Sequence, residues 1–138
     1  RDALRAALAN GVIDAVCSDH QPHDPDAKLK PYPATEAGAS GVDSFLGLGL
    51  KLVHEGLLSL ETWLDRCALA PRRILGLALP SLDHGAVPDF VLLDAQAERK
   101  LTSATMVSRG KNTPFRGWRL PGRVDLVAIV DRLWIREP

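Results

Sequence analysis

A polar cluster at residues 18–24 holds the side chains best suited to chemistry in this 138-residue sequence. Asp19, His20, His23 and Asp24 place two carboxylates and two imidazoles within six consecutive residues. A carboxylate can ligate a divalent metal or act as a general base, and a neutral imidazole can ligate a metal or, once protonated, bind an anionic substrate. Spacing alone leaves an alternative open, a polar turn in which Asp19 caps backbone amides and the histidines are solvated.

The sequence pattern of residues 1–17 predicts a helix and then a buried strand directly before this cluster. Residues 1–10 have the apolar spacing of an amphipathic helix that ends at Gly11, and residues 12–17 are short, β-branched and mostly apolar. The proline-rich stretch 18–40 is then a long loop that begins where the strand ends. That position is the one at which α/β barrels keep their catalytic residues.

Helices and then strands are expected in the rest of the chain. The apolar spacing predicts helices near residues 42–53, 60–67 and 71–76, with Ser59 as a cap and Pro71 as a helix start. From residue 79 onward the pattern predicts strands at 90–93, 124–130 and 133–135, the last two joined by a turn at residues 131–132. We therefore divide the chain into residues 1–78 and a small β unit of residues 79–138.

Composition argues against several classes of protein. The 17 Lys and Arg residues balance 17 Asp and Glu residues, so no overall field attracts nucleic acid or an anionic membrane. No apolar run approaches the roughly 20 residues that span a bilayer. Cys17 and Cys67 lie too far apart for a C-x-x-C pair and are expected to be small core residues in a reducing compartment. We expect a cytoplasmic protein with neither a nucleic-acid nor a membrane partner.

A locally basic segment at residues 109–123 contains Lys111, four arginines and the aromatic Phe115. Such a segment is able to contact phosphate or RNA. The balanced charge of the chain favours the other interpretation, a structural turn that links strands.

The sequence S-D-H-Q-P-H at residues 18–23, with Lys28 five residues further on, resembles the signature of the dihydroorotases, zinc amidohydrolases of pyrimidine synthesis. Four further segments are similar to dihydroorotase motifs in the same order: A-G-A-S-G-V-D at 37–43, A-P-R-R-I-L-G-L at 70–77, G-A-V-P-D-F at 85–90 and S-R-G-K-N-T-P-F at 108–115. Ordered matches along nearly the whole chain are far more specific than one motif.

The resemblance implies an α/β fold class and covers the C-terminal third of the family. Residues 1–78 would be the last strand, active-site loop and closing helices of a metal-dependent (β/α)8 barrel. Residues 79–138 would belong to the small β-sandwich domain beside it. The sequence opens without methionine and already inside a helix, so we expect a fragment that is inactive alone and ordered with the remainder of its barrel or another chain.

The resemblance also implies roles for individual residues. Asp19 would be a metal ligand and the general base that takes a proton from a metal-bridging hydroxide. His23 would contact the substrate carboxylate, and the main chain at Ala37 and Gly38 would hydrogen-bond the dihydropyrimidine ring. The implied reaction is the reversible cyclisation of N-carbamoyl-L-aspartate to dihydroorotate, with zinc as cofactor. The other metal ligands, a His-x-His pair, a carboxylated lysine and further histidines, would lie upstream.

Departures from the family pattern open a second possibility. Cys17 replaces a Gly or Ala, Gln21 replaces an Ala, Ala37 replaces a Pro, and V-D-S at 42–44 replaces L-E-T. D-H-Q-P-H also resembles noncatalytic dihydroorotase-like chains that are structural partners of aspartate carbamoyltransferase. The upstream ligands would discriminate the two. A third class, a binding module that folds from these residues alone, fits the helix-first start poorly.

Overall fold

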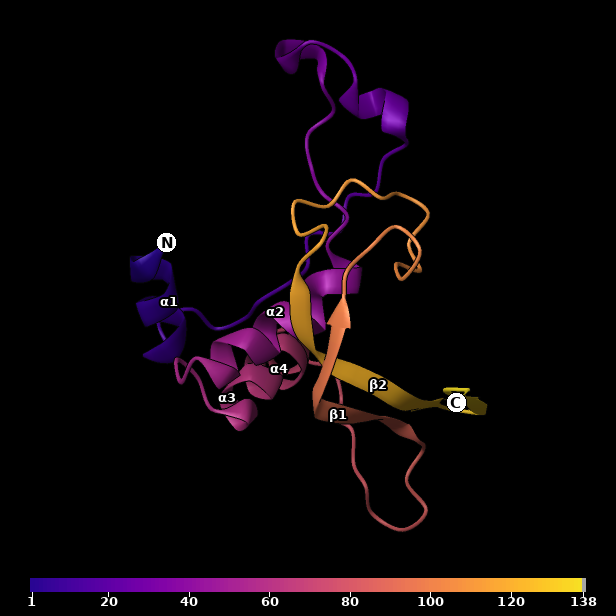
Figure 1. The fold of residues 1–138 in the computed structure, drawn as a ribbon. Coiled ribbons are helices and arrows are strands. Elements are labelled where there is room, and N and C mark those ends of the chain that lie inside the picture. Colours follow the sequence, from indigo (N-terminus) through magenta and orange to yellow (C-terminus); the bar gives the residue numbers. More distant parts are fainter. Residues whose placement is uncertain (138) are drawn as a thin grey trace.

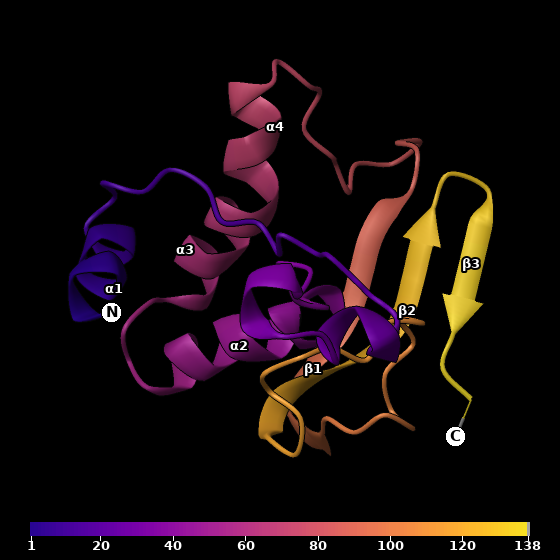
Figure 2. The same cartoon turned by 90° about the horizontal axis from the view of Figure 1, so that it is seen from above.

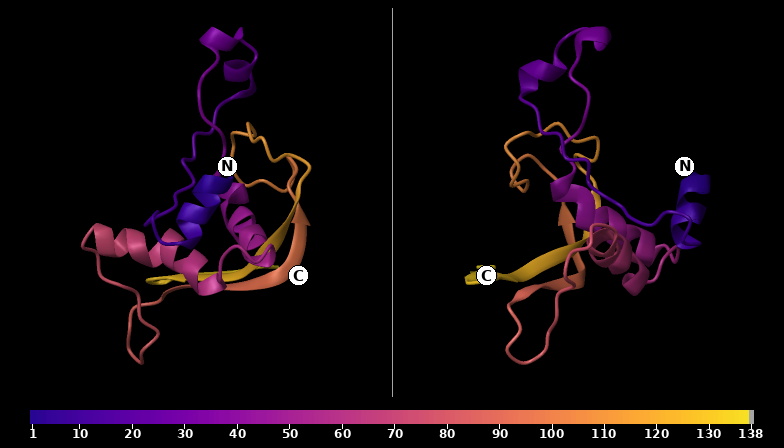
Figure 3. Two further views of the ribbon diagram at one scale, coloured as in Figure 1. Left: turned by 90° about the vertical axis from the view of Figure 1, so that its left-hand side faces the viewer. Right: turned by 180° about the vertical axis from the view of Figure 1, so that it is seen from behind.

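The computed structural model describes residues 1–137 and consists of helices packed beside a three-stranded antiparallel sheet (Figures 1 and 2). In chain order the elements are α1 (Asp2–Ala9), α2 (Val42–His54), α3 (Leu60–Leu64), α4 (Ala70–Ile74), β1 (Asp89–Lys100), β2 (Arg119–Ile129) and β3 (Arg132–Ile135). The loop between α1 and α2 contains two short 3-10 turns, Pro25–Lys28 and Tyr32–Ala34. Both views of Figure 3 show this loop standing out from the body of the molecule.

The sheet confirms the strands expected in the second half of the chain and lengthens the first two. Its order is β1-β2-β3, and the β1–β2 ladder runs from the pair Asp89↔Ile129 to the pair Lys100↔Arg119. A register shift follows Asp94, whose carboxylate accepts hydrogen bonds from the amides of Gln96 and Ala97, at 2.9 and 3.0 Å. The side chain thus satisfies amides that leave the ladder.

The hairpin between β2 and β3 turns one residue earlier than expected. The turn occupies Val130 and Asp131, and Arg132 already belongs to β3. Val130 adopts a positive φ of 56°, a conformation that β-branched residues rarely take. Its amide donates to the carbonyl of Pro88 at 2.7 Å, which holds the turn against the start of β1.

The buried strand expected at residues 12–17 is not formed, so that prediction is wrong for the described chain. The amides of Val12 and Ile13 instead donate to the carbonyl of Ala7 in α1, at 2.9 and 3.1 Å. The amide of Val16 donates to the carbonyl of Arg66 at 2.9 Å. A strand satisfies its amides on a neighbouring strand. Among residues 1–137 no strand lies beside this segment, so its hydrogen bonds go to helices.

The two cysteines differ in their surroundings. Cys67 packs against the apolar cluster around Trp63, and burial raises the pKa of its thiol. That agrees with the expected role as a small core residue. Cys17 is exposed, which contradicts the same expectation, because the strand that would have buried it is absent from residues 12–17.

The helices expected at 60–67 and 71–76 form one continuous helical stretch. As expected, Ser59 caps its start by accepting a hydrogen bond from the amide of Thr62 at 3.1 Å. Between α3 and α4 the helix widens into a π turn over Asp65–Leu69. Pro71 is the second residue of α4, and because it has no amide hydrogen it interrupts the regular hydrogen-bond ladder at this point.

Two apolar clusters hold the helices to each other and to the sheet. The first surrounds Trp63, which is 3% exposed and packs against Phe45 of α2 with ring centroids 5.2 Å apart. The second consists of Leu101, Met106 and Leu120, with Leu48 of α2 packed against it. Because α2 contributes to both clusters, it fixes the position of the loop that precedes it relative to the sheet that follows.

Gly49 provides a test of this packing. A Cβ atom built on Gly49 would overlap the indole of Trp63, so no larger residue fits without displacing that side chain. We expect Gly49→Ala to lower the free energy of unfolding by about 1–3 kcal/mol, the usual cost of overpacking a core. Chemical denaturation of the complete protein measures it. The exposed His54 on the same helix is the control, since His54→Ala should change stability by no more than about 0.5 kcal/mol. Equal stability of the two variants would contradict this packing.

Apolar side chains remain exposed on both faces of the sheet. Seven large apolar side chains of its strands are more than a third exposed: Phe90, Val91, Leu92, Ile129, Leu133, Trp134 and Ile135. The strand register places Val91, Ile129 and Trp134 on one face of the sheet and the other four on the opposite face. Exposed apolar surface of this amount is typical of a region that contacts other protein. In the described part of the chain, no helix combines the length and apolar character needed to cross a membrane.

Candidate active site

The long loop at residues 18–40 is closed at its base. His20 and Ala39 form an isolated parallel β-bridge, and the amide of Gln21 donates to the carbonyl of Ala39 at 2.8 Å. The two arms of the loop therefore run side by side where they leave the body, as Figure 1 shows. This pairing brings His23 on one arm into contact with Ala37 on the other.

Asp19 lies exposed at the beginning of the loop with a positive φ of 41°. Its Oδ1 accepts a hydrogen bond from the side-chain amide of Gln21 at 3.1 Å. The Gln21 side chain in turn lies against Gly38, where a Cβ atom would overlap it. Gly38 has φ +100°, a conformation that also favours glycine. Gln21, which replaces the Ala of the family pattern, thus places its side-chain amide between Asp19, the predicted base, and the main chain of Gly38, the predicted substrate contact.

His23 contacts the opposite arm directly. Its Nε2 lies 2.8 Å from the carbonyl oxygen of Ala37. That oxygen can only accept, so Nε2 carries a hydrogen and donates it. Nδ1 is then the nitrogen able to meet a substrate, and it donates to a carboxylate only when the ring is protonated.

Lys28 braces the same arm. Its ammonium group donates to the carbonyl of Gly38 at 2.9 Å and also to the carbonyl of Glu36. These contacts span the loop and hold the segment around Ala37 beside the ring of His23. The structure therefore brings His23, Ala37 and Gly38 together, and their roles in substrate binding stay predictions.

His20 has a structural task that the sequence did not reveal. Its Nδ1 accepts hydrogen bonds from the amides of Gly41 and Val42, at 3.1 and 3.2 Å, and so caps the start of α2. Its Nε2 lies 3.1 Å from the hydroxyl of Ser108. With both ring nitrogens engaged, His20 positions α2 and is not free to ligate a metal. A histidine cap of this kind leaves no local motif, because the amides that donate to it lie more than 20 residues away.

Zinc does not fit these residues on their own. Within residues 1–137 no group of three or more His, Cys, Asp or Glu side chains is arranged to hold a metal ion. Structural and catalytic zinc sites use three or four protein ligands. Asp19 offers one carboxylate, which is a suitable donor but not a site. The role of Asp19 as a metal ligand stays a prediction.

The basic segment at residues 109–123 behaves as a structural turn. Several of its charged groups are engaged within the chain: the Lys111 ammonium donates to the carbonyl of Met106 at 2.7 Å, and Arg119 pairs with Glu98 at 2.9 Å. Arg123 pairs with Asp125 at 2.7 Å, which lowers the pKa of that carboxyl. These contacts favour the structural interpretation over a phosphate or RNA contact.

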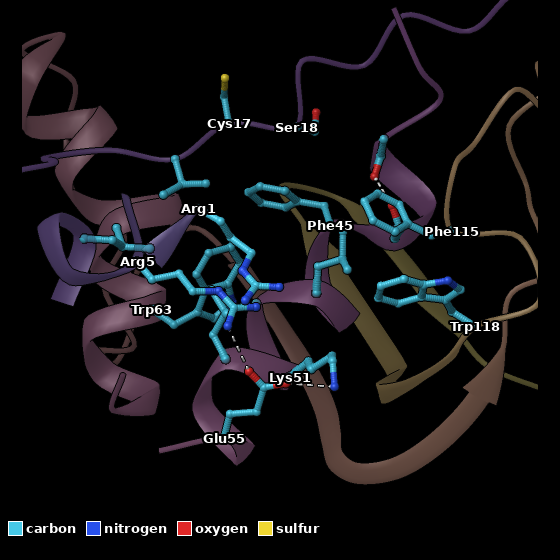
Figure 4. Close-up of a pocket in the computed structure, with 17 residues that line it drawn as sticks. Arg1, Arg5, Cys17, Ser18, Phe45, Lys51, Glu55, Trp63, Phe115 and Trp118 are labelled. Carbon is cyan, nitrogen blue, oxygen red and sulfur yellow. Dashed lines mark hydrogen bonds and ion pairs between the residues drawn. The ribbon is translucent and has the colours of Figure 1, made fainter. Parts of the chain in front are cut away.

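A cavity of about 680 Å³ lies between α1, α2 and residues 16–18 (Figure 4). Its apolar wall contains Phe45 and Trp63, and its rim holds a hydrogen-bonded pair, Lys51 and Glu55, 2.8 Å apart. The Lys51 ammonium lowers the pKa of the Glu55 carboxyl. Ser18 reaches this cavity, whereas Asp19, His23, Ala37 and Gly38 do not line it. The cavity and the predicted site are therefore separate places.

Comparison with known proteins gives consistent results, although no family model matches the chain. The chain is 46% identical over 124 residues to a dihydroorotase-like protein of Pseudomonas aeruginosa, covering 90% of this chain and 29% of that protein. It is 40% identical over 122 residues to a dihydroorotase of Citrifermentans bemidjiense, with 88% and 29% coverage. A solved D-hydantoinase superposes with a TM-score of 0.84 and 26% identity, over 99% of this chain and 31% of the hydantoinase.

By its sequence and fold, the chain belongs to the amidohydrolase superfamily. Within that superfamily it is similar to dihydroorotases and dihydroorotase-like proteins, and it spans about 29% of the length of those relatives. The predicted resemblance and the predicted fold class, a piece of a (β/α)8 amidohydrolase, are confirmed. The division at residues 78 and 79 stays a prediction.

Proposed function

We propose that the complete protein carrying this chain is a dihydroorotase, which interconverts N-carbamoyl-L-aspartate and dihydroorotate in pyrimidine synthesis. The observation that supports this most is the base of the loop, where His23 contacts Ala37 across two arms that are paired through His20 and Ala39. Relatives with dihydroorotase names at 40% identity support the same proposal. Conversion of N-carbamoyl-L-aspartate by the complete protein is the test.

Asp19 acts as the general base in this proposal. In the hydrolytic direction its carboxylate takes a proton from the attacking water and gives it to the ring nitrogen as the amide bond breaks. Its exposed position at the start of the loop leaves room for a substrate, and the Gln21 amide fixes one of its oxygens. Ring closure follows the same path in reverse.

His23, Ala37 and Gly38 bind the substrate. The protonated ring of His23 meets the substrate carboxylate through Nδ1, while Nε2 stays on the carbonyl of Ala37. The main chain at Ala37 and Gly38 hydrogen-bonds the ring amides. Zinc as cofactor, ligands from the remainder of the barrel or another chain, and a cytoplasmic location belong to the same proposal.

Removal of the His23 imidazole tests the substrate contact. A hydrogen bond to a charged group contributes about 1.5–3 kcal/mol, so His23→Ala should raise KM for N-carbamoyl-L-aspartate by about tenfold to a hundredfold, and turnover should fall as well. Steady-state kinetics of the complete protein measure both. His84→Ala makes the same change in an exposed turn and should leave KM unaltered. An unchanged KM in His23→Ala would remove this residue from the site.

A noncatalytic dihydroorotase-like partner of aspartate carbamoyltransferase is the alternative. Two observations favour it: the 46% identity to a protein named dihydroorotase-like, and the Gln21 amide that occupies Oδ1 of the predicted base. This alternative predicts a complete protein without turnover that co-purifies with aspartate carbamoyltransferase.

A further inference from the structure

The candidate loop rests on a turn that comes much later in the chain. Residues 106–112, between β1 and β2, lie beneath the base of the loop, and Figure 1 shows this orange segment directly below the purple loop. Gly110 is buried there, and a Cβ atom on it would lie 2.6 Å from Cβ of Pro22 and 2.7 Å from the amide nitrogen of His23. The loop and the turn are therefore in close backbone contact.

Asn112 joins this turn to both arms of the loop. On the first arm, its Oδ1 accepts a hydrogen bond from the amide of His23 at 2.9 Å, and its Nδ2 donates to the carbonyl of Gln21 at 3.1 Å. On the second arm, Nδ2 also donates to the carbonyl of Gly38 at 3.3 Å. The main-chain carbonyl of Asn112 accepts from the amide of Ser40 at 3.0 Å. One residue thus fixes the separation of the two arms.

The turn itself is held in place from α2. The Asp43 carboxylate accepts hydrogen bonds from the amides of Val107 and Ser108, at 2.7 and 3.3 Å. The Ser108 hydroxyl lies 3.1 Å from Nε2 of His20, whose other nitrogen caps the same helix. The turn is therefore a fixed support for the loop.

We propose that Asn112 is a positioning residue, which sets the geometry of the His23 main chain and the Gly38 carbonyl through its side-chain amide. The inference rests on the proposed function, because His23 and Gly38 are the substrate contacts of that proposal. Asn112 touches neither substrate nor reacting atoms itself. Its effect passes through the loop, so it should act on substrate binding rather than on the proton transfer by Asp19.

The chemistry of the contacts requires an amide. One acceptor faces an amide of the loop and two donors face carbonyls, which is the pattern an Asn side chain offers. In Asn112→Asp the shape is kept but both donors are lost, and a negative oxygen would face two carbonyls. In Asn112→Ala the shape and all three side-chain contacts are lost. The aspartate variant thus separates hydrogen bonding from filling of space.

The experiment compares the complete wild-type protein with its Asn112→Ala, Asn112→Asp and Asn10→Ala variants. Asn10→Ala removes the same side chain from an exposed helix end. Because misplacement of substrate contacts by about an ångström can cost about a hundredfold in rate, we expect kcat/KM to fall about a hundredfold in both Asn112 variants, mainly through KM. Amide hydrogen exchange of His23 should be about tenfold faster in Asn112→Ala, which removes the acceptor of that amide, but not in Asn112→Asp, which keeps it. The Asn10 variant should match wild type in both measurements.

Three other outcomes would overturn either the positioning role of Asn112 or the proposed function. A fall in apparent kcat at constant KM, together with a lower melting temperature, would make Asn112 a stability residue and overturn the positioning role. A wild-type KM in Asn112→Asp would show that only shape matters, with the same consequence. A wild-type protein without turnover would refute the proposed function, and the hydrogen exchange of His23 alone would then decide whether Asn112 positions the loop.

Discussion

Asp19→Asn in the complete protein should reduce kcat for N-carbamoyl-L-aspartate by about 10²–10⁴-fold, the range expected for loss of a general base. An amide has nearly the same shape as a carboxylate, but it neither takes a proton at neutral pH nor carries a charge. Asp19 is exposed, and its side chain bonds to that of Gln21, so its replacement should leave the fold intact. Steady-state kinetics combined with a thermal melt measure the two effects separately.

Asp26 on the same loop provides a matched control. It is exposed in the 3-10 turn Pro25–Lys28, and Asp26→Asn makes the same chemical change a short distance along the chain. Wild-type turnover in Asp26→Asn, with turnover lost in Asp19→Asn, would support the assignment of the base. Wild-type turnover in both variants would overturn that assignment and favour the structural-partner alternative.

Residues 1–138 expressed alone should not behave as a monodisperse monomer. The described chain leaves Val12 75% exposed, Leu133 62% exposed and Trp134 52% exposed, and apolar surface of this extent is normally covered by protein. We expect association or aggregation by light scattering coupled to gel filtration. We also expect neither dihydroorotase activity nor stoichiometric zinc after dialysis, because a single carboxylate is a poor zinc site.

Two results would contradict this second prediction. A monomer that unfolds cooperatively, as small single domains do, would show that the exposed surface needs no partner. Zinc held tightly by the isolated chain would mean that the loop from Asp19 to Asp24 binds metal in a way that the structure of residues 1–137 does not show.

Local sequence pattern predicted the elements whose hydrogen bonds are local or lie between close neighbours. Helix α2 follows from its apolar spacing, and the β2–β3 hairpin from two apolar runs around a short turn. The prediction of a strand at residues 12–17 was wrong because a strand needs hydrogen-bond partners on a neighbouring strand that is remote in sequence. A β-branched run does not indicate whether such a neighbouring strand is present. The π turn before Pro71 had a local cause, a proline without an amide hydrogen, although the pattern suggested two separate helices.

The candidate site shows the same limit. The motif at residues 18–23 identified the loop, and the resemblance to dihydroorotases identified Ala37 and Gly38 as candidate substrate contacts. The contacts of Asn112 and the capping by His20 did not, because they join groups 20 to 90 residues apart: Asn112 Oδ1 meets an amide 89 positions earlier, and His20 meets amides 21 and 22 positions later. Such contacts are set by how α2 packs on the sheet.

The most direct test of the central claim is the rate at which the complete protein interconverts N-carbamoyl-L-aspartate and dihydroorotate, measured together with its zinc content. We predict conversion in both directions and about two zinc ions per chain, as in two-metal hydrolytic sites. A complete protein that converts neither compound, contains no metal and co-purifies with aspartate carbamoyltransferase would contradict the claim and establish a structural partner in its place.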